Sequence, residues 1–420
     1  MKGWEARQLG EIYDVRDGTH DSPTYQTEGY ALITSKNLKS NGLSFENIKY
    51  ISETDYRKIN ERSAVHKGDI LLAMIGTIGN PIVVEIEPNF TIKNVALFKV
   101  PKNQDSYFLK YYLETEYVQS KMQREAKGTT QKFVGLGYLR SFPIVVPPLS
   151  EQKRIVSIVD EAFEAIDIAI DNTKQNLTNA RELFDSYLNA IFTQKCDGWE
   201  EKKLGTLINV LTDYHANGSY EKLKQNVTLL DEDSHAYMVR STDFENSFTN
   251  SLKYIDRHAY EFLSKSKVFS DDIIISKIGN AGKVYLMPKI DRPCSLAMNL
   301  FLLRTNEKQI RSDYLYFFLE SQFGKIQIAE RLNGTATKTI RKDAVRSINI
   351  FVAPITEQKD IVEKLDLIIF ETQRLEAIYC QKLAALNELK QSILHKAFTG
   401  ELTADKADLM TNIEQEAICT

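Results

Sequence analysis

A long helical segment occurs twice in this chain at a fixed offset, and this constrains the fold more than any other feature. The first copy runs from Glu151 to Thr193 and is entered by Pro-Pro-Leu-Ser-Glu-Gln-Lys-Arg-Ile-Val, starting at Pro147. The second is entered by Pro-Ile-Thr-Glu-Gln-Lys-Asp-Ile-Val, which starts at Pro354, 206 positions after Pro148. Each copy closes on a Phe-Thr pair at the same offset, so we expect two helices of equal length.

Both segments begin with the same helix signals and carry the same apolar pattern. We expect Ser150 and Thr356 to act as N-caps, with an acidic residue in each first turn where the helix dipole favours it. Apolar residues then recur at alternating steps of three and four, as in Ile155, Val159 and Ile166. Such a stripe on a long helix predicts a coiled-coil seam. A pair of core helices within one large domain is the alternative, which the matching lengths and the lack of interior proline or glycine disfavour.

Composition excludes several classes of protein. With 420 residues and 43% hydrophobic content, the chain is long enough for two or more globular domains, and we expect a soluble, cytoplasmic protein. No apolar run is long enough to span a bilayer, and the first ten residues do not resemble a signal peptide. The four cysteines and six histidines are dispersed, which predicts reduced thiols and no metal site.

Net charge is unevenly distributed along the chain. Residues 1–150 hold 19 basic against 17 acidic side chains, and residues 197–355 hold 22 against 20. The helical segments carry the acidic excess, with 5 against 8 in residues 151–196 and 7 against 12 in residues 356–420. The mildly basic globular parts permit contact with nucleic acid without requiring it.

The globular parts are duplicated as well, which predicts two units of about 200 residues by comparison of the repeats. Each opens on Gly-Trp-Glu, at Gly3 and at Gly198, and each continues into a short strand that ends in a polar turn. The first turn holds Ser35 and Lys36, and the second holds Arg240. Polar side chains at a strand end can be presented to a ligand, although the same residue types are also common in ordinary surface loops.

A buried strand followed by a Gly-x-x-Gly turn comes next in both units. The first turn contains Thr77, and the second contains Lys277, Asn280 and Lys283. Glycines in such a turn permit positive φ and close approach of another backbone or of a phosphate. A nucleotide-binding phosphate loop is excluded because the Gly-Lys-Ser/Thr ending is missing. A structural tight turn and a DNA phosphate contact both remain possible interpretations.

An aromatic amphipathic helix then leads to a polar loop in each unit. The loops read Gly-Thr-Thr-Gln-Lys, ending at Lys132, and Gly-Thr-Ala-Thr-Lys, ending at Lys338. Small hydroxyls, backbone N–H groups and one cation could contact a phosphate. A helix C-cap followed by a solvated loop is the alternative.

Taken in order, these motifs resemble those of the specificity subunit of type I restriction-modification enzymes. The series is Gly-Asp-Ile-Leu with Gly-Thr-Ile-Gly, Gly-Thr-Thr-Gln-Lys, Pro-Pro-Leu-Ser-Glu-Gln-Lys-Arg-Ile, and a closing Ala-Phe-Thr-Gly-Glu-Leu from Ala397. The resemblance extends over residues 1–403. Each motif alone is weak, but their order, occurring twice, is specific.

The resemblance implies an α+β fold in which two duplicated α/β target-recognition domains are separated by two long antiparallel coiled-coil helices, with pseudo-twofold symmetry. The domains would be residues 1–149 and 196–355, the helices 150–195 and 356–403, and the C-terminal tail 404–420. It also implies a chain that is not an enzyme by itself. Each domain would read one half of a bipartite, asymmetric double-stranded DNA site, and the helices would set the spacing between the half-sites.

The resemblance further implies the partners and cofactors of a larger complex. Two modification (methyltransferase) subunits would dock on the helices through the exposed charges opposite the seam, bringing S-adenosylmethionine for adenine N6 methylation. Restriction subunits would add ATP- and Mg-dependent translocation and cleavage. No cofactor, metal or catalytic residue is expected on this chain itself.

Nine residues are candidates for DNA contacts. Base edges could be reached by Ser35 and Lys36, and phosphates by Lys132 and Lys338. The full set is Ser35, Lys36, Thr77, Lys132, Arg240, Lys277, Asn280, Lys283 and Lys338. The sequence departs from the family pattern in three places, with Ala353-Pro354 for Pro-Pro, Asn80 where lysine is usual, and Asn280-Ala281 inside the second turn. These departures leave the individual contacts open.

The alternatives to this interpretation are a stand-alone DNA methyltransferase, a nuclease and a coiled-coil scaffold. A nuclease is unsupported, because Glu201-Lys202-Lys203 supplies a bare Glu-x-Lys with no convincing metal-binding aspartate upstream. A stand-alone adenine methyltransferase should carry Asn/Asp-Pro-Pro-aromatic, but Pro147-Pro148 lies between Val146 and Leu149. The Phe-Val-Gly-Leu-Gly stretch from Phe133 precedes a strand and has no glycine in its repeat partner, so it is a poor cofactor motif. A coiled-coil scaffold without DNA binding agrees with the charges but leaves the duplicated α/β units unexplained.

Overall fold

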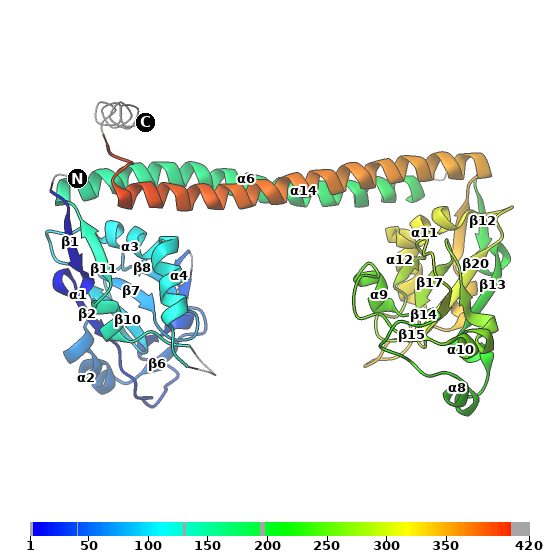
Figure 1. The fold of residues 1–420 in the computed structure, drawn as a ribbon, viewed down its shortest axis with the longest axis horizontal. Coiled ribbons are helices and arrows are strands. Elements are labelled where there is room, and N and C mark those ends of the chain that lie inside the picture. Colours follow the sequence, from blue (N-terminus) through cyan, green and yellow to red (C-terminus); the bar gives the residue numbers. More distant parts are fainter. Residues whose placement is uncertain (1–2, 40, 129–131, 194–197, 405–420) are drawn as a thin grey trace. The chain divides into compact units, whose positions relative to one another are not determined.

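The computed structural model describes residues 3–39, 41–128, 132–193 and 198–404. By its internal contacts the chain divides into two units, Met1–Lys174 with Gln381–Thr420, and Gln175–Cys380. We call these unit 1 and unit 2. Both boundaries fall inside long helices, α6 (Leu149–Thr193) and α14 (Ile355–Thr399). Each long helix therefore contributes one half to unit 1 and the other half to unit 2 (Figure 1).

A four-stranded sheet forms the centre of unit 1, and its counterpart in unit 2 has the same strand order. The order is β2-β10-β7-β8 in unit 1 and β13-β20-β17-β18 in unit 2. The strands in unit 1 are β2 (Asp14–Asp17), β10 (Val95–Lys99), β7 (Ile70–Ala73) and β8 (Gly79–Val83). Those in unit 2 are β13 (Ile208–Asp213), β20 (Leu300–Thr305), β17 (Ile273–Ser276) and β18 (Val284–Leu286). The predicted duplication of the strand arrangement is thus confirmed.

A second, smaller sheet accompanies each central one. In unit 1 its order is β6-β3-β9, with β6 (Lys49–Ile51), β3 (Tyr30–Ile33) and β9 (Phe90–Ile92). In unit 2 it is β15-β14-β19-β16, with β15 (Tyr254–Ile255), β14 (Ala236–Val239), β19 (Cys294–Leu296) and β16 (Lys267–Val268). Both contain one parallel pair, β3 with β9 and β14 with β19. A two-stranded ribbon completes each unit, β1 (Glu5–Gln8) with β11 (Pro143–Val146), and β12 (Glu200–Lys203) with β21 (Asn349–Val352).

Helices cover the face of the central sheet that the small sheet leaves uncovered. α3 (Ser106–Glu114) packs on β8, and α11 (Ser312–Glu320) packs on β18. α4 (Glu116–Glu125) and α12 (Gln322–Glu330) follow directly. In unit 1, Leu72 and Phe98 belong to the core beneath α3, whereas Leu71 and Leu97 belong to the core shared with the small sheet. Successive side chains along these strands therefore point alternately into one core and the other, as expected of strands that are buried on both faces.

Short elements connect these layers. In unit 1 they are α1 (Leu9–Ile12), η1 (Ser35–Asn37), β4 (Leu38–Lys39), β5 (Gly42–Leu43), α2 (Glu53–Ser63) and α5 (Leu136–Arg140). In unit 2 they are α7 (Leu204–Leu207), η2 (Tyr214–Asn217), α8 (Tyr220–Asn226), α9 (Ser241–Glu245), α10 (Arg257–Phe262), η3 (Ser264–Ser266) and α13 (Lys342–Arg346).

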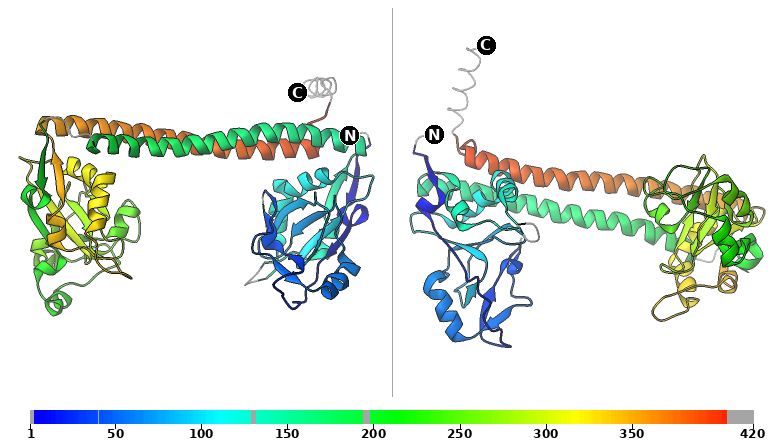
Figure 2. Two further views of the ribbon diagram at one scale, coloured as in Figure 1. Left: turned by 180° about the vertical axis from the view of Figure 1, so that it is seen from behind. Right: turned by 60° about the horizontal axis from the view of Figure 1, so that its bottom comes forward.

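The two long helices run antiparallel within each unit. In unit 1 the Lys390 Nζ lies 2.6 Å from an Asp167 carboxylate oxygen, and in unit 2 the Arg181 Nε lies 3.0 Å from Glu376. Figures 1 and 2 both show the first half of α6 beside the last half of α14 in unit 1. Each helix has 45 residues, so the predicted equal length is confirmed. Buried seam residues include Ile155, Val159, Ile166, Thr173 and Ala180 on α6, and Ile361, Leu365 and Thr372 on α14.

The predicted N-caps were wrong. The helices begin at Leu149 and Ile355, so Ser150 and Thr356 lie inside the first turn. The prolines before these positions are tolerated because the first turn needs no backbone N–H donor. Each helix end also packs into a unit core, since Phe192 at the end of α6 contacts Tyr314 and Phe318 in unit 2, and Phe398 at the end of α14 contacts Phe108 in unit 1.

Candidate nucleic-acid interface

The predicted polar segments of unit 1 converge at one end of its sheets. The glycine turn after β7 pairs with the hydroxyl loop, because the Gly76 N–H donates to the Lys132 carbonyl at 2.9 Å. The same turn reaches the segment after β3, where the Asn80 side-chain amide donates to the Leu38 carbonyl at 3.4 Å. Loops that are far apart in sequence are therefore held together by hydrogen bonds to backbone carbonyls.

Unit 2 brings its corresponding loops together in a similar way. The Ile340 N–H donates to the Lys277 carbonyl at 3.1 Å, and the Lys277 N–H donates to the Asn299 carbonyl at 2.7 Å. Asn299 and its counterpart Asn94 both adopt positive φ, 66° and 56°, a conformation that asparagine tolerates better than most side chains. The turn before β20 or β10 thus fixes the position of its neighbours in both units.

The predicted glycine conformations are confirmed, and the second glycine of each turn has a packing role. Gly76, Gly79, Gly279 and Gly282 all have positive φ. A Cβ on Gly79 would lie 2.4 Å from the Gln119 Oε1 on α4, and one on Gly282 would lie 2.4 Å from the Ile328 Cγ2 on α12. At Gly279, by contrast, a Cβ would meet open space. A side chain at the second glycine of each turn would therefore clash with a helix, whereas the first glycine of the turn in unit 2 is exposed and has room for one.

Six of the nine candidate residues present exposed side chains on these loops. They are Lys36, Thr77, Lys132, Asn280, Lys283 and Lys338. Thr77 and Lys132 come from paired loops in unit 1, and Asn280 and Lys338 from paired loops in unit 2. Ser35 is half-buried, and its hydroxyl donates to the Asn94 carbonyl at 3.3 Å. Its side chain is therefore engaged in holding the turn.

Three of the candidates, all cations in unit 2, form ion pairs within the unit, and Lys283 does so although it is exposed. Arg240 binds the buried Asp243 at 2.6 Å and also donates to the Ser251 carbonyl. Lys283 lies 3.0 Å from Glu245, and this hydrogen bond raises the pKa of Lys283. Lys277 lies 2.9 Å from Asp213. DNA would have to compete with these carboxylates, so the three cations are weaker candidates for phosphate contacts than Lys132 and Lys338.

Two aspartates that were not among the sequence-based candidates lie at equivalent strand ends of the two units and bind basic side chains. Asp213 ends β13 and binds Lys277 at 2.9 Å and Lys342 at 3.1 Å. Burial alone would raise the pKa of Asp213, but the hydrogen bonds from the two lysines outweigh it and the pKa lies below its ordinary value. Asp17 ends β2 at the equivalent position and binds Arg62 and His20. The two aspartates occupy the same position in the two repeats, and this match in the sequence could have identified both.

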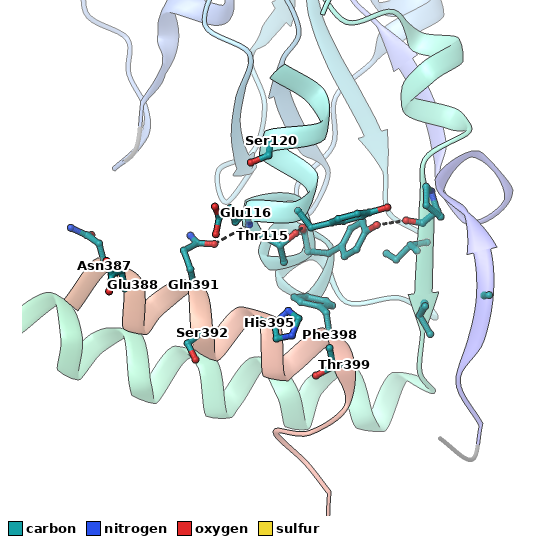
Figure 3. Close-up of a pocket in the computed structure, with 16 residues that line it drawn as sticks. Thr115, Glu116, Ser120, Asn387, Glu388, Gln391, Ser392, His395, Phe398 and Thr399 are labelled. Atoms are coloured by element: carbon teal, nitrogen blue, oxygen red, sulfur yellow. Dashed lines mark hydrogen bonds between the residues drawn. The ribbon is translucent and has the colours of Figure 1, made fainter. Parts of the chain in front are cut away.

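The same unit 1 contains a large groove away from these loops. Its volume is about 1100 Å³, and it lies between α4, β11 and the last turns of α14 (Figure 3). Tyr112, Tyr117 and Val145 contribute apolar walls. In unit 2 the counterparts of Tyr117 and Val145 are Phe323 and Phe351. The rings of these two phenylalanines stack with their centroids 4.8 Å apart. None of the nine candidate residues lines the groove.

Other kinds of site find no support within the described residues. Across 3–39, 41–128, 132–193 and 198–404, no group of three histidine, cysteine or acidic side chains could hold a metal ion. In the same part of the chain, no helix is long and apolar enough to cross a membrane.

Comparison with known proteins gives the family. The sequence profile of the type I restriction modification DNA specificity domain matches residues 1–179 and 196–380. The chain therefore belongs to the family of type I restriction-modification DNA specificity proteins. It is 22% identical to the type I restriction enzyme MjaVIII specificity subunit of Methanocaldococcus jannaschii, over 95% of this chain and 93% of that one. It is also 22% identical to the EcoBI specificity subunit of Escherichia coli, over 91% and 85% of the two chains.

Solved structures share the fold. A chain from a structural study of the assembly and conformational transition of the type I R-M system superimposes with a TM-score of 0.73, at 18% identity, covering 95% of this chain and 98% of that one. The HsdS subunit from Thermoanaerobacter tengcongensis gives 0.59, also at 18% identity, with 96% and 98% covered. These likenesses confirm the expected fold class of two α/β units with long helices.

Proposed function

We propose that this chain is the DNA-reading subunit of a type I restriction-modification complex, in which each unit recognises one half of a bipartite, asymmetric site. The observation that carries the proposal is the convergence, in both units, of the same loops with different side chains. A shared scaffold with different exposed residues suits a target whose halves differ in sequence. The recognition domains in this proposal are residues 1–149 and 196–355, joined by the helices 150–195 and 356–403, with residues 404–420 as a tail.

The contacts divide by chemistry. Lys132 and Lys338 are exposed and lie on hydroxyl-containing loops, so they fit phosphate contacts that fix the register on DNA. Lys36, Thr77 and Asn280 carry donors or acceptors that could reach base edges. Arg240, Lys277 and Lys283 act from within ion pairs, and Ser35 holds the turn at Asn94. The first group would set affinity and the second would set sequence preference.

The long helices offer a docking surface for the methyltransferase subunits. Exposed charges opposite the seam are the expected contacts for these partners, but α14 also exposes apolar side chains. Leu367, Phe370 and Ile378 lie on one face of α14 in unit 2 and are 61%, 62% and 45% exposed. Exposed apolar residues gathered on one face are typical of a contact surface for another protein. We therefore assign the docking of modification subunits to this face together with its flanking charges.

The chemistry of methylation and cleavage resides on other subunits in this proposal. Two modification subunits would bring S-adenosylmethionine, and restriction subunits would bring ATP and Mg. The complex would act on double-stranded DNA in the cytoplasm. This chain would select the DNA site at which the methyl group is transferred.

The decisive experiment is a map of methylated adenine in total DNA from cells that make this chain with its modification subunit. A single bipartite motif with a gap of fixed length is expected, and it should vanish when the chain is deleted. Exchanging residues 1–149 for the same region of a relative should change one half of the motif and leave the other half intact. Unchanged methylation after deletion would favour a coiled-coil scaffold without DNA binding.

A further inference from the structure

Unit 2 has an apolar depression of about 380 Å³ beside its candidate DNA-contacting loops. Its floor includes Leu223 and Met238, which are buried. Its rim consists of three apolar side chains that are largely exposed, Tyr220 at 67%, Leu229 at 51% and Met298 at 50%. Three large apolar groups exposed together around one depression form a surface suited to an apolar ligand group.

The depression adjoins the interface directly. Arg240 and Asn299 both line it. The Asn299 carbonyl accepts the hydrogen bond from the Lys277 backbone N–H, so the rim residue Met298 immediately precedes the turn that holds the glycine loop. A ligand that reached the predicted base-contacting loops of unit 2 would therefore meet this depression.

Unit 1 differs at the position that corresponds to the rim residue Met298. The position equivalent to Met298, immediately before the positive-φ asparagine, is Lys93. The Lys93 Nζ donates to the Ser22 hydroxyl at 2.6 Å. One scaffold position thus carries a cation in unit 1 and a thioether in unit 2.

We propose that the depression in unit 2 receives the 5-methyl edge of a thymine in the half-site read by that unit, an inference that rests on the proposed function. The thymine methyl is the one apolar feature that base pairs present in the major groove, and apolar side chains contact it in other protein–DNA complexes. The depression is wider than one methyl group, so it accommodates the edge of a T·A pair. Met298 has a flexible, polarisable side chain that can close over such an edge.

Replacing thymine by uracil tests this inference without altering the protein. The complex of this chain with its modification subunits is titrated with duplexes that carry the methylation motif, and each thymine of the second half-site is replaced in turn by uracil. One replacement should weaken binding about four-fold, the effect of removing one buried methyl group. Thymines in the first half-site should give no such effect.

Two variants assign the effect to the depression. In Met298→Lys, which copies the residue of unit 1, the sensitivity to uracil should disappear while the first half of the motif is unchanged. Leu229→Ser should reduce the sensitivity in the same direction. Both side chains are about half exposed, so both variants are expected to fold. The matched control, Lys93→Met in unit 1, should leave the response to uracil in the second half-site unchanged.

The outcomes separate this inference from the proposal beneath it. If the complex selects its motif but no uracil replacement in the second half-site changes binding, or if that half-site contains no T·A pair, the assignment of the depression is overturned and the proposed function stands. If Met298→Lys instead prevents assembly with the modification subunits, the depression is a protein contact and the assignment is likewise overturned. Loss of all sequence preference in the unaltered chain would overturn the proposed function itself.

Discussion

The two units have the same internal ion pair and the same buried glutamine, but their exposed loops differ. Asp69 pairs with Lys99 in unit 1, and Asp272 pairs with Arg304 at 2.7 Å in unit 2, in each case joining the start of one central strand to the end of another. Both aspartates are buried, and each also accepts a backbone N–H from the turn before its strand. The framework that shapes each unit is therefore maintained by the same chemistry.

The loops show the opposite behaviour. At equivalent positions of the two glycine turns, unit 1 has the buried Met74 and unit 2 has Lys277, and unit 1 has Asn80 where unit 2 has Lys283. These exchanges leave the backbone contacts between the loops in place, since Val134 bonds to Met74 as Ile340 bonds to Lys277. The comparison teaches that the fold and the contacts between loops can be held constant while the side chains on those loops change.

The largest expected effect comes from the aromatic residue that seals each long helix into its unit. Phe192 is 1% exposed, and its ring packs against Tyr314 at 5.5 Å and Phe318 at 5.3 Å. Phe192→Ala should destabilise unit 2 by about 3–5 kcal/mol, the usual loss for removing a buried phenylalanine. Phe398→Ala, the counterpart in unit 1, should cost less, roughly 2 kcal/mol, because that ring is only half-buried.

Each unit contains one tryptophan, so the two effects can be measured separately. Trp4 packs against the core of unit 1 and Trp199 against the core of unit 2. In urea titrations, a Trp4→Phe background reports unit 2 and a Trp199→Phe background reports unit 1. Equal losses for both alanine variants in both backgrounds would contradict the separation into two units.

The buried glutamine at the start of each long helix should have a smaller effect that is equal in the two units. Gln358 is fully buried, accepts the Arg311 N–H at 2.9 Å, and donates to the Ala353 and Gln309 carbonyls. Gln358→Leu would leave these groups without partners and should cost roughly 2–3 kcal/mol.

The matching variant in unit 1 is Gln152→Leu. Gln152 accepts the Asp105 N–H at 2.9 Å and donates to the Pro147 carbonyl at 2.8 Å. The same urea titrations, read through the tryptophan of each unit, provide the measurement. A loss confined to one of the two variants would show that the shared motif has different roles in the two units.

These glutamines also show what the sequence could and could not predict. The repeated Glu-Gln-Lys motif located both helices and their equal lengths, because a long apolar stripe is readable from one helix alone. The role of the glutamine was not readable, since the backbone N–H groups that donate to its side-chain oxygen lie more than forty residues away, at Asp105 and Arg311. The predicted caps at Ser150 and Thr356 failed for a related reason, as the proline already occupies the boundary.

The candidate site likewise has a part that could be predicted from local sequence and a part that could not. Loop composition identified Lys132 and Lys338 and the glycine turns, because those signals are local. It did not identify Asp17 and Asp213, whose significance depends on cations that the fold brings in from elsewhere, Arg62 in one case and Lys342 in the other. Loop composition also gave Arg240 and Lys338 as equal candidates, although the structure pairs Arg240 with the buried carboxylate of Asp243.

Asp213 offers a pH-dependent test of this hidden part of the site. Because its pKa is lowered in the folded chain, its ionised form stabilises unit 2 above the ordinary pKa of 3.8, and this stabilisation is lost as the pH falls through the lower folded value. Asp213→Asn should cost roughly 1–2 kcal/mol near neutral pH, since two hydrogen bonds to charged groups are weakened. The variant should also lose less stability than the parent chain on acidification below about pH 4.

The measurement is urea unfolding at several pH values, followed through Trp199. Asp17→Asn serves as the control, because it alters the equivalent residue of unit 1 and should leave the Trp199 transition unchanged. A parent chain and an Asp213→Asn variant with parallel pH profiles would show that the two lysines do not hold the carboxylate as the structure indicates.

The smallest effects are expected from single lysines on the loops, and here the two kinds of cation in unit 2 can be compared directly. Lys338 is exposed, whereas Lys283 is already paired with Glu245 at 3.0 Å. Lys338→Ala should weaken DNA binding to all sequences and reduce the salt dependence, the slope of log K against log salt concentration, by about one. Lys283→Ala should reduce the slope by less, because Glu245 already neutralises the charge of Lys283 before DNA binds.

Anisotropy titrations of the complex between about 50 and 200 mM salt measure both slopes, and Lys132→Ala in unit 1 should match Lys338→Ala. A change in the methylated motif, without a change in slope, would instead make Lys338 a residue that reads bases.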